Sequence, residues 1–242
     1  MKKMVVVENK KIEDSIKSTL KLIGIFALFL FSSILQIPII KLLNYDIDNL
    51  TTNQNLIVTA CSDIILLIIL VSIYYKSLKK DFKNLKGNLY KYLEEGVKYW
   101  IIGLIVMMVS NVLISLLTTA EATNEESVQE FIHASKYFSI ITVGIIGPII
   151  EELVFRKAFR EAIKNDMSFI LISGLIFGGL HVILSFNSAW DLLYIIPYSS
   201  LGIAFGYTYC KTNNIYVSTF IHIFHNTVLT ILSIIGAGFI IW

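Results

Sequence analysis

Two adjacent glutamates, Glu151 and Glu152, lie in an apolar stretch of the chain, residues 140–159, and Arg156 follows them. Ionisable side chains inside a membrane are costly, so a set of this kind usually has a function. In a helix Glu152 and Arg156 share a face, whereas Glu151 points about 100° away from Glu152. The spacing predicts that Glu152 pairs with Arg156 and that Glu151 remains available as a general base, which takes a proton from water.

The alternative is that both glutamates are solvated at a helix end, which Arg156 and Arg160 would mark. On a regular helix, however, Glu151 lies about 14 Å from Arg160, which is too deep for easy hydration from the membrane surface. We therefore favour the functional interpretation.

Two further apolar segments carry histidines. His181 follows Phe177 by four residues, and His222 precedes Asn226 by four. Imidazole exchanges protons near neutral pH, and an asparagine amide can donate hydrogen bonds to an oxyanion. Counted at about 1.5 Å per residue from the basic ends of their helices, Glu151, His181 and His222 all lie about 10 to 20 Å deep. This agreement predicts that they meet in one site.

Each of these polar residues also has a plainer interpretation. A single histidine in an apolar helix often makes only a packing hydrogen bond, and a polar face such as that of His222 and Asn226 can hold two helices together. His225 fits that structural role best, so we leave it outside the catalytic set. Asp63 lies near the predicted outer end of another apolar segment and is interpreted as structural.

The elements that must position these groups are membrane-spanning helices. Of the 242 residues, 55% are hydrophobic and 16% are charged, and the mean hydropathy of +0.71 excludes an ordinary soluble domain. A span needs about 20 apolar residues. We therefore predict an all-α fold, a polytopic bundle of seven transmembrane helices, or eight if the last one breaks near Gly236 and Gly238. The seven stretches are 19–43, 56–75, 97–119, 137–159, 168–186, 191–210 and 215–242.

The basic residues predict how the bundle is oriented. With the N-terminus in the cytoplasm, only Lys41 and Lys136 fall in outer loops, so 18 of the 20 basic residues obey the positive-inside rule. The expected partner of this inner face is anionic membrane lipid. No basic patch with interleaved aromatic residues indicates nucleic acid.

The sequence gives little sign of disulfide or metal chemistry. Cys61 and Cys210 are predicted near opposite membrane surfaces, too far apart to pair. No CxxC or HExxH pair is present. If a metal such as zinc is bound, its predicted ligands are Glu151, His181 and His222.

The three motifs together resemble those of the CPBP family, the CAAX-protease and bacteriocin-processing group of intramembrane proteases, also called the Abi family. The family pattern is Glu-Glu-x-x-x-Arg, Phe-x-x-x-His and His-x-x-x-Asn on separate helices. Here it stands at 151–156, 177–181 and 222–226. The resemblance covers roughly residues 140–230, and Lys157 departs from the glycine of many bacterial members.

The resemblance implies a role for each residue. Glu151 would activate water with help from His181, and His222 with Asn226 would hold the tetrahedral oxyanion. The other two charges of the first motif would support them. Family members are described both as metalloproteases and as metal-independent glutamate proteases. We expect metal-free chemistry, with zinc as the alternative.

The combined prediction is an intramembrane endopeptidase, a multi-pass protein of the bacterial cytoplasmic membrane with its cavity open to the cytoplasm. Residues 1–130 would form N-terminal membrane helices and surface linkers, and 131–242 the CPBP-like catalytic core. Its substrates would be lipidated C-terminal peptides, bacteriocin or pheromone precursors, or membrane-protein segments. The alternative is a non-catalytic protein for bacteriocin self-immunity or for sequestering a partner. A transporter ranks last, because no repeat symmetry is found.

Overall fold

The computed structural model describes residues 2–118 and 122–236, and this part of the chain is helical with no β-strand. Short 3-10 turns occur at 32–35 and 189–194, and π turns at 142–146 and 152–158. The α-helices are α1 (Lys2–Leu30), α2 (Gln36–Leu42), α3 (Thr52–Lys86), α4 (Leu89–Ser115), α5 (Thr123–Ala134), α6 (Lys136–Ile141), α7 (Gly147–Glu151), α8 (Phe159–Ala162), α9 (Asp166–Ile183), α10 (Ile195–Thr212) and α11 (Ile215–Ile234). The predicted all-α fold is confirmed.

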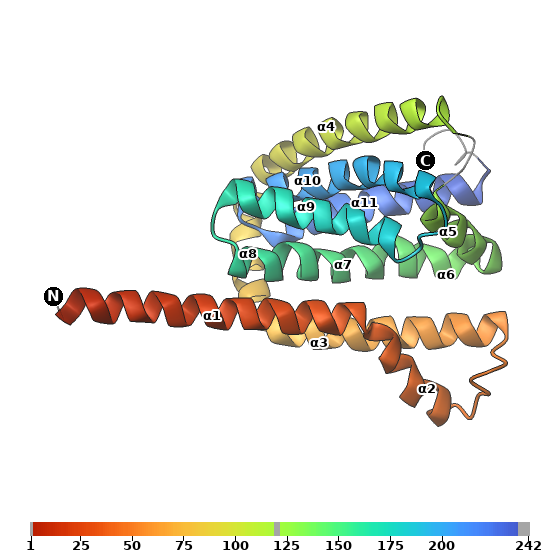
Figure 1. The fold of residues 1–242 in the computed structure, drawn as a ribbon, viewed down its shortest axis with the longest axis horizontal. Coiled ribbons are helices and arrows are strands. Elements are labelled where there is room, and N and C mark those ends of the chain that lie inside the picture. The colour runs from red at the N-terminus through yellow and green to blue at the C-terminus, as the bar shows by residue number, and fades with distance from the viewer. Residues whose placement is uncertain (1, 119–121, 237–242) are drawn as a thin grey trace.

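The helices form a bundle of nearly parallel rods (Figure 1). The helices α1 and α3 run along one side, and the row α6, α7 and α8 lies next to them. Between that row and α4 lie α9, α10 and α11. The N-terminus and the α8–α9 connection are at one end of the bundle, whereas α5 is at the other. The basic segments of the sequence therefore gather at the end opposite α5.

The number of membrane spans differs from the prediction of seven. By length and hydropathy five helical stretches among the described residues can cross a membrane, or six if the bent pair 10–30 and 32–42, at 62° to each other, is one span. The helix α10 is not among them. It packs against α4, α9 and α11, and its polar residues Ser199, Thr208 and Thr212 are buried. The predicted alternative of an eighth helix concerns the chain after Gly236, and residues 237–242 lie outside the described part.

The span that carries the glutamates, 136–162, is continuous but not a regular helix. Pro148 lacks the N–H that would bond to the carbonyl of Gly144, and the π turn 142–146 lies directly before this proline. A second π turn begins directly after Glu151 and carries Glu152 and Arg156. Such local widening of a helix is frequent at functional sites.

Two glycines set the distance between α9 and α10. A Cβ added to Gly174 would come within 2.8 Å of the backbone nitrogen of Ile203, and one added to Gly178 would collide with Ser199. The helices can therefore approach closely only because these two positions carry no side chain. Elsewhere in the bundle Cys61 and Cys210 are free thiols, as expected.

Candidate active site

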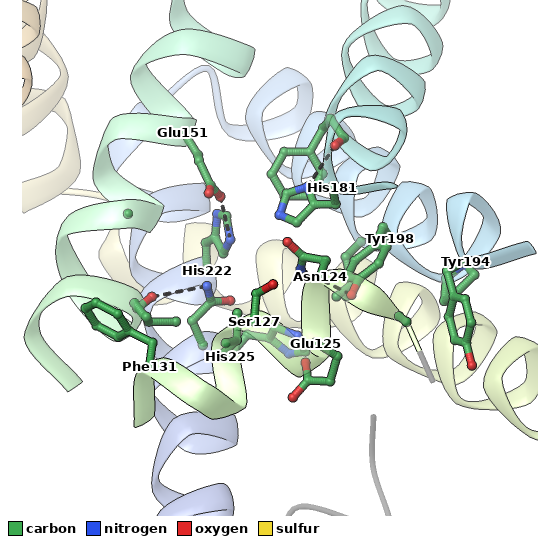
Figure 2. Close-up of a pocket in the computed structure, with 18 of the residues that line it drawn as sticks. Asn124, Glu125, Ser127, Phe131, Glu151, His181, Tyr194, Tyr198, His222 and His225 are labelled. Carbon is green, nitrogen blue, oxygen red and sulfur yellow. Dashed lines mark hydrogen bonds and ion pairs between the residues drawn. The ribbon is translucent and has the colours of Figure 1, made fainter. Parts of the chain in front are cut away.

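The structure brings Glu151 and His222 together from two separate helices. Glu151 ends α7 and His222 lies in the second turn of α11. The Oε2 atom of Glu151 is 3.5 Å from Nε2 of His222, with the glutamate side chain 20% exposed and the histidine 3%. Figure 2 shows the two groups pointing toward each other at the edge of a pocket. The predicted meeting of these residues is thus found, through a contact longer than an ordinary hydrogen bond.

A buried row of charges continues behind His222. Its Nδ1 atom is 3.2 Å from Oε1 of Glu152, and Arg156 Nε lies 3.4 Å from that same oxygen. Glu152 and Arg156 are fully buried. The guanidinium lies over the rings of Phe177 and Phe205, with centroids at 5.2 and 5.8 Å, and its nitrogens have no hydrogen-bond partner among the described residues. The predicted pairing of Glu152 with Arg156 is confirmed as an electrostatic contact.

Glu152 has a second role that the sequence did not show. A carboxylate oxygen accepts, so Nδ1 of His222 donates to Glu152 and Nε2 faces Glu151 and the pocket. Phe205 stacks on the imidazole at 4.5 Å between ring centroids and 24° between planes. Glu152, Glu151 and Phe205 therefore all contact the His222 ring and fix its orientation.

His181 lines the same pocket, on the other side of its space from Glu151 (Figure 2). Its Nδ1 atom is 2.8 Å from the carbonyl oxygen of Phe177, and its ring stacks on Tyr198 at 5.0 Å. A carbonyl only accepts, so Nδ1 carries the hydrogen and Nε2 of the neutral ring is an acceptor. No hydrogen bond or ion pair joins His181 to Glu151 in this structure, so its help to Glu151 stays a prediction.

Asn226 also lines the pocket. Its side-chain amide donates one hydrogen bond, of 3.3 Å, to the carbonyl oxygen of Val143 in the first π turn. The amide has a second N–H, which this bond leaves available. The bond holds the amide at the pocket wall, where the second N–H can serve an oxyanion.

The pocket is a cavity of about 520 Å³, a size typical of sites for small ligands or a few residues of peptide. Its lining includes Ser127 of α5, Tyr194 ahead of α10, and Ser233 near the end of α11. These residues belong to the end of the bundle opposite the basic segments. The helix α5, which is not apparent from hydropathy, and the helix ends next to it thus form part of the cavity wall, and the expected opening of the cavity to the cytoplasm stays a prediction.

The helix α5 is held in place by Asp191. This carboxylate, 3% exposed, accepts hydrogen bonds from the backbone N–H groups of Ser188 at 2.7 Å, Asn187 at 2.9 Å and Thr123 at 3.3 Å, and from the Thr123 hydroxyl at 3.0 Å. Burial raises the pKa of Asp191, but these hydrogen bonds lower it further, so it lies below its usual value. Asp191 thus ties the start of α5 to the turn ahead of α10.

Two cavity residues were assigned only structural roles from the sequence. Asp63 of α3 lines the cavity together with Glu151, although its depth in an apolar helix was a signal of function. His225 also lines it, and its Nδ1 accepts a 3.3 Å hydrogen bond from Nε1 of Trp100. That bond joins α11 to α4, which agrees with the structural role predicted for His225.

The described residues contain no group of three His, Cys, Asp or Glu side chains that could hold a metal ion. Glu151 and His222 face each other, whereas His181 lies across the cavity from Glu151, so the three side chains are not gathered around one point. The arrangement therefore does not fit a zinc site formed by Glu151, His181 and His222.

Comparison with known proteins places this site in a family. Residues 133–228, which contain all three motifs, match the family described as "Type II CAAX prenyl endopeptidase Rce1-like". A 117-residue stretch is 32% identical to the "Putative membrane peptidase YdiL" of Bacillus subtilis, covering 47% of this chain and 44% of that protein. Residues 133–228 are thus similar to a family of CAAX endopeptidases. The resemblance seen in the three motifs is confirmed.

Two other relatives match longer stretches of the chain. An "Uncharacterized protein" of Mycoplasma capricolum is 28% identical over 200 residues, which is 74% of this chain and 55% of that protein. The "UPF0177 protein YxdF" of Lactococcus lactis is 27% identical over 135 residues, covering 51% of this chain and 70% of that protein. The chain spans about half the length of the first two relatives. No solved structure matches it.

Proposed function

We propose that this protein is an intramembrane endopeptidase that uses Glu151 to activate a water molecule. The observation that carries the proposal is the contact of Glu151 with His222, 3.5 Å apart at the wall of a cavity between apolar helices. His181 and Asn226 line the same cavity. The family match is to CAAX prenyl endopeptidases, and the Bacillus relative is named as a membrane peptidase, which supports hydrolysis as the chemistry.

In the proposed reaction Glu151 takes one proton from water, and the resulting hydroxide attacks the carbonyl carbon of the scissile peptide bond. The carbonyl oxygen becomes an oxyanion, to which the second N–H of Asn226 donates a hydrogen bond. When the C–N bond breaks, the carboxylic acid of Glu151 returns its proton to the leaving amine. Because Nε2 of His181 is an acceptor in the neutral ring, it can hold the water in place.

In this scheme Glu152 and Phe205 hold the His222 ring in a fixed orientation. Glu152 fixes its Nδ1–H, and Nε2 lies within reach of the proton that Glu151 takes up. Arg156 offsets the negative charge of Glu152, which would otherwise be isolated in the protein interior. The two residues thus support the reaction through His222.

The proposed substrate is a peptide segment of a membrane-associated or lipidated protein, and the proposed location is the bacterial cytoplasmic membrane. A lipid-modified C-terminal peptide, a bacteriocin or pheromone precursor, and a membrane-protein segment all remain within this class. The cavity of about 520 Å³ is large enough for a few residues of such a segment. The names of the matched proteins mention neither a metal nor a bacteriocin.

The test is cleavage of a panel of membrane-anchored peptides by the purified chain, followed by mass spectrometry. Glu151→Gln keeps the shape of the side chain but removes the base, so we expect it to abolish cleavage. Glu126→Gln is the matched control, because Glu126 is exposed on α5 and does not line the cavity. An excess of chelator should leave cleavage unchanged.

Two outcomes would contradict the proposal. Full cleavage by Glu151→Gln would exclude this residue as the base. Tight peptide binding without cleavage of any bound peptide by the wild-type chain would favour the non-catalytic alternative, a protein that sequesters a peptide or confers immunity.

A further inference from the structure

The cavity beside Glu151 carries an excess of negative charge. Asp63 from α3, Glu125 from α5 and Glu151 from α7 line it, and none of its lining residues in the described chain is a lysine or arginine. The structure does not describe residues 119–121 and 237–242, and the sequence has no lysine or arginine in either stretch. Apart from histidine, the cavity therefore offers its occupant carboxylates and no cation.

Asp63 has no assigned part in the proposed reaction. It is partly buried on a candidate membrane span, and none of the described residues forms a hydrogen bond or ion pair with its side chain. The nearby negative charge of Glu151 repels a charge at this position. A carboxylate at such a depth requires a counter-charge to remain ionised at low energy.

Two of the buried acidic residues have that counter-charge, and the other two, Glu125 and Asp191, accept hydrogen bonds from neighbouring residues instead. Asp81 is 2.6 Å from Nζ of Lys157, and Glu152 lies 3.4 Å from Nε of Arg156. Asp63 departs from this pattern, and it faces the cavity instead of a neighbouring helix. The missing cation would therefore come from the molecule that enters the cavity.

We propose that Asp63 binds a lysine or arginine side chain of the substrate peptide while the scissile bond lies at Glu151. The inference rests on the proposed function and adds a substrate class: an apolar segment with one basic residue near the cleaved bond. Phe131 also lines the cavity, and an aromatic ring can interact favourably with a cation. An acidic side chain or a free carboxyl terminus at this position would be repelled.

The test uses apolar, fluorescently labelled peptides that carry a single lysine, glutamine or glutamate at each of several positions. Their affinity for the purified full chain in a neutral maltoside detergent is measured by fluorescence anisotropy, and their cleavage by mass spectrometry. At the preferred position, the lysine peptide should bind about tenfold more tightly than the glutamine peptide, as expected for a hydrogen bond between charged groups. The glutamate peptide should bind most weakly.

Substitutions of Asp63 separate its charge from its shape. In Asp63→Asn the lysine peptide should bind no more than about twofold more tightly than the glutamine peptide. A neutral hydrogen bond of low strength accounts for a difference of that size. Asp63→Glu, which keeps the charge, should retain part of the preference and covers the case in which the asparagine variant does not fold. Asp48→Asn is the matched control, because Asp48 is exposed in the α2–α3 loop outside the cavity.

The outcomes distinguish this site from the catalytic proposal. Equal binding of the lysine and glutamine peptides at every position, or a full preference in Asp63→Asn, would overturn the cation site. Binding that responds to added Zn²⁺ or Ca²⁺ rather than to peptide charge would also overturn it. A charge preference that depends on Asp63, without any cleavage that depends on Glu151, would refute only the proposed reaction.

Discussion

The buried pair of Glu152 and Arg156 gives a quantitative prediction for the substitution Glu152→Gln. Both side chains are fully buried, so solvent does not screen their interaction. Removing one partner of such a pair leaves an uncompensated charge and typically costs about 3–5 kcal/mol. Glu151 supplies a second negative charge near Arg156, which partly compensates the arginine when Glu152 is lost. We therefore expect a loss of stability at the lower end of that range, about 3 kcal/mol. At about 2–4 °C per kcal/mol for a chain of this size, the melting temperature should fall by about 6–12 °C.

The assay is thermal unfolding of the purified chain in detergent, arranged as a double-mutant cycle. Arg156→Met alone should also destabilise, because it leaves Glu152 buried without its cationic partner. The double variant should be more stable than the sum of the single effects predicts, since replacing a whole buried pair is often neutral. Glu161→Gln is the control: its pair with Lys21 is 2.7 Å long but about one-third exposed, so the change should stay below about 1 kcal/mol. If Glu152→Gln unfolds at the wild-type temperature, the argument from burial is wrong.

Three further predictions concern the frame around the site. Gly178→Ala should destabilise by about 1–3 kcal/mol, because its Cβ would meet the backbone of α10, whereas Gly24→Ala, with nothing within 4 Å, should be neutral or slightly stabilising in the same unfolding assay. Asp191→Asn should lower the melting temperature at neutral pH and reduce its pH dependence. The folded pKa of this carboxyl is lowered, so its contribution is complete above the usual aspartate pKa and is lost as the pH falls through the folded value. Lys157→Met should destabilise by about 3 kcal/mol, because it leaves Asp81 buried without its partner at 2.6 Å, and Lys157→Met with Asp81→Leu should recover most of the loss.

Hydropathy and motif spacing were sufficient to predict the long helices and the pairing of Glu152 with Arg156. The apolar stretches at 56–75 and 137–159, and most of 97–119, lie in long helical segments, because a run of apolar residues is a strong signal for a membrane helix. The pairing of Glu152 with Arg156 followed from their four-residue spacing. These predictions depend on local sequence alone.

The remaining features depend on how the helices pack, which local sequence does not contain. The contact of Glu152 with His222 requires one helix to be rotated and shifted against another, 70 residues away in the chain. The stretch 191–210 was predicted as one of seven membrane spans from its composition, without knowledge of the helices that pack around it. The position of Asp63 in the cavity wall likewise depends on the packing of α3 against α7.

The central claim is that Glu151 is the base that activates water, and the most direct measurement is single-turnover cleavage by the wild type and by Glu151→Gln. The account predicts a rate about 10²–10⁴-fold lower for the variant, with peptide affinity nearly unchanged, because a general base acts in the transition state rather than in binding. A variant that cleaves within about twofold of the wild-type rate at equal peptide occupancy would contradict the account.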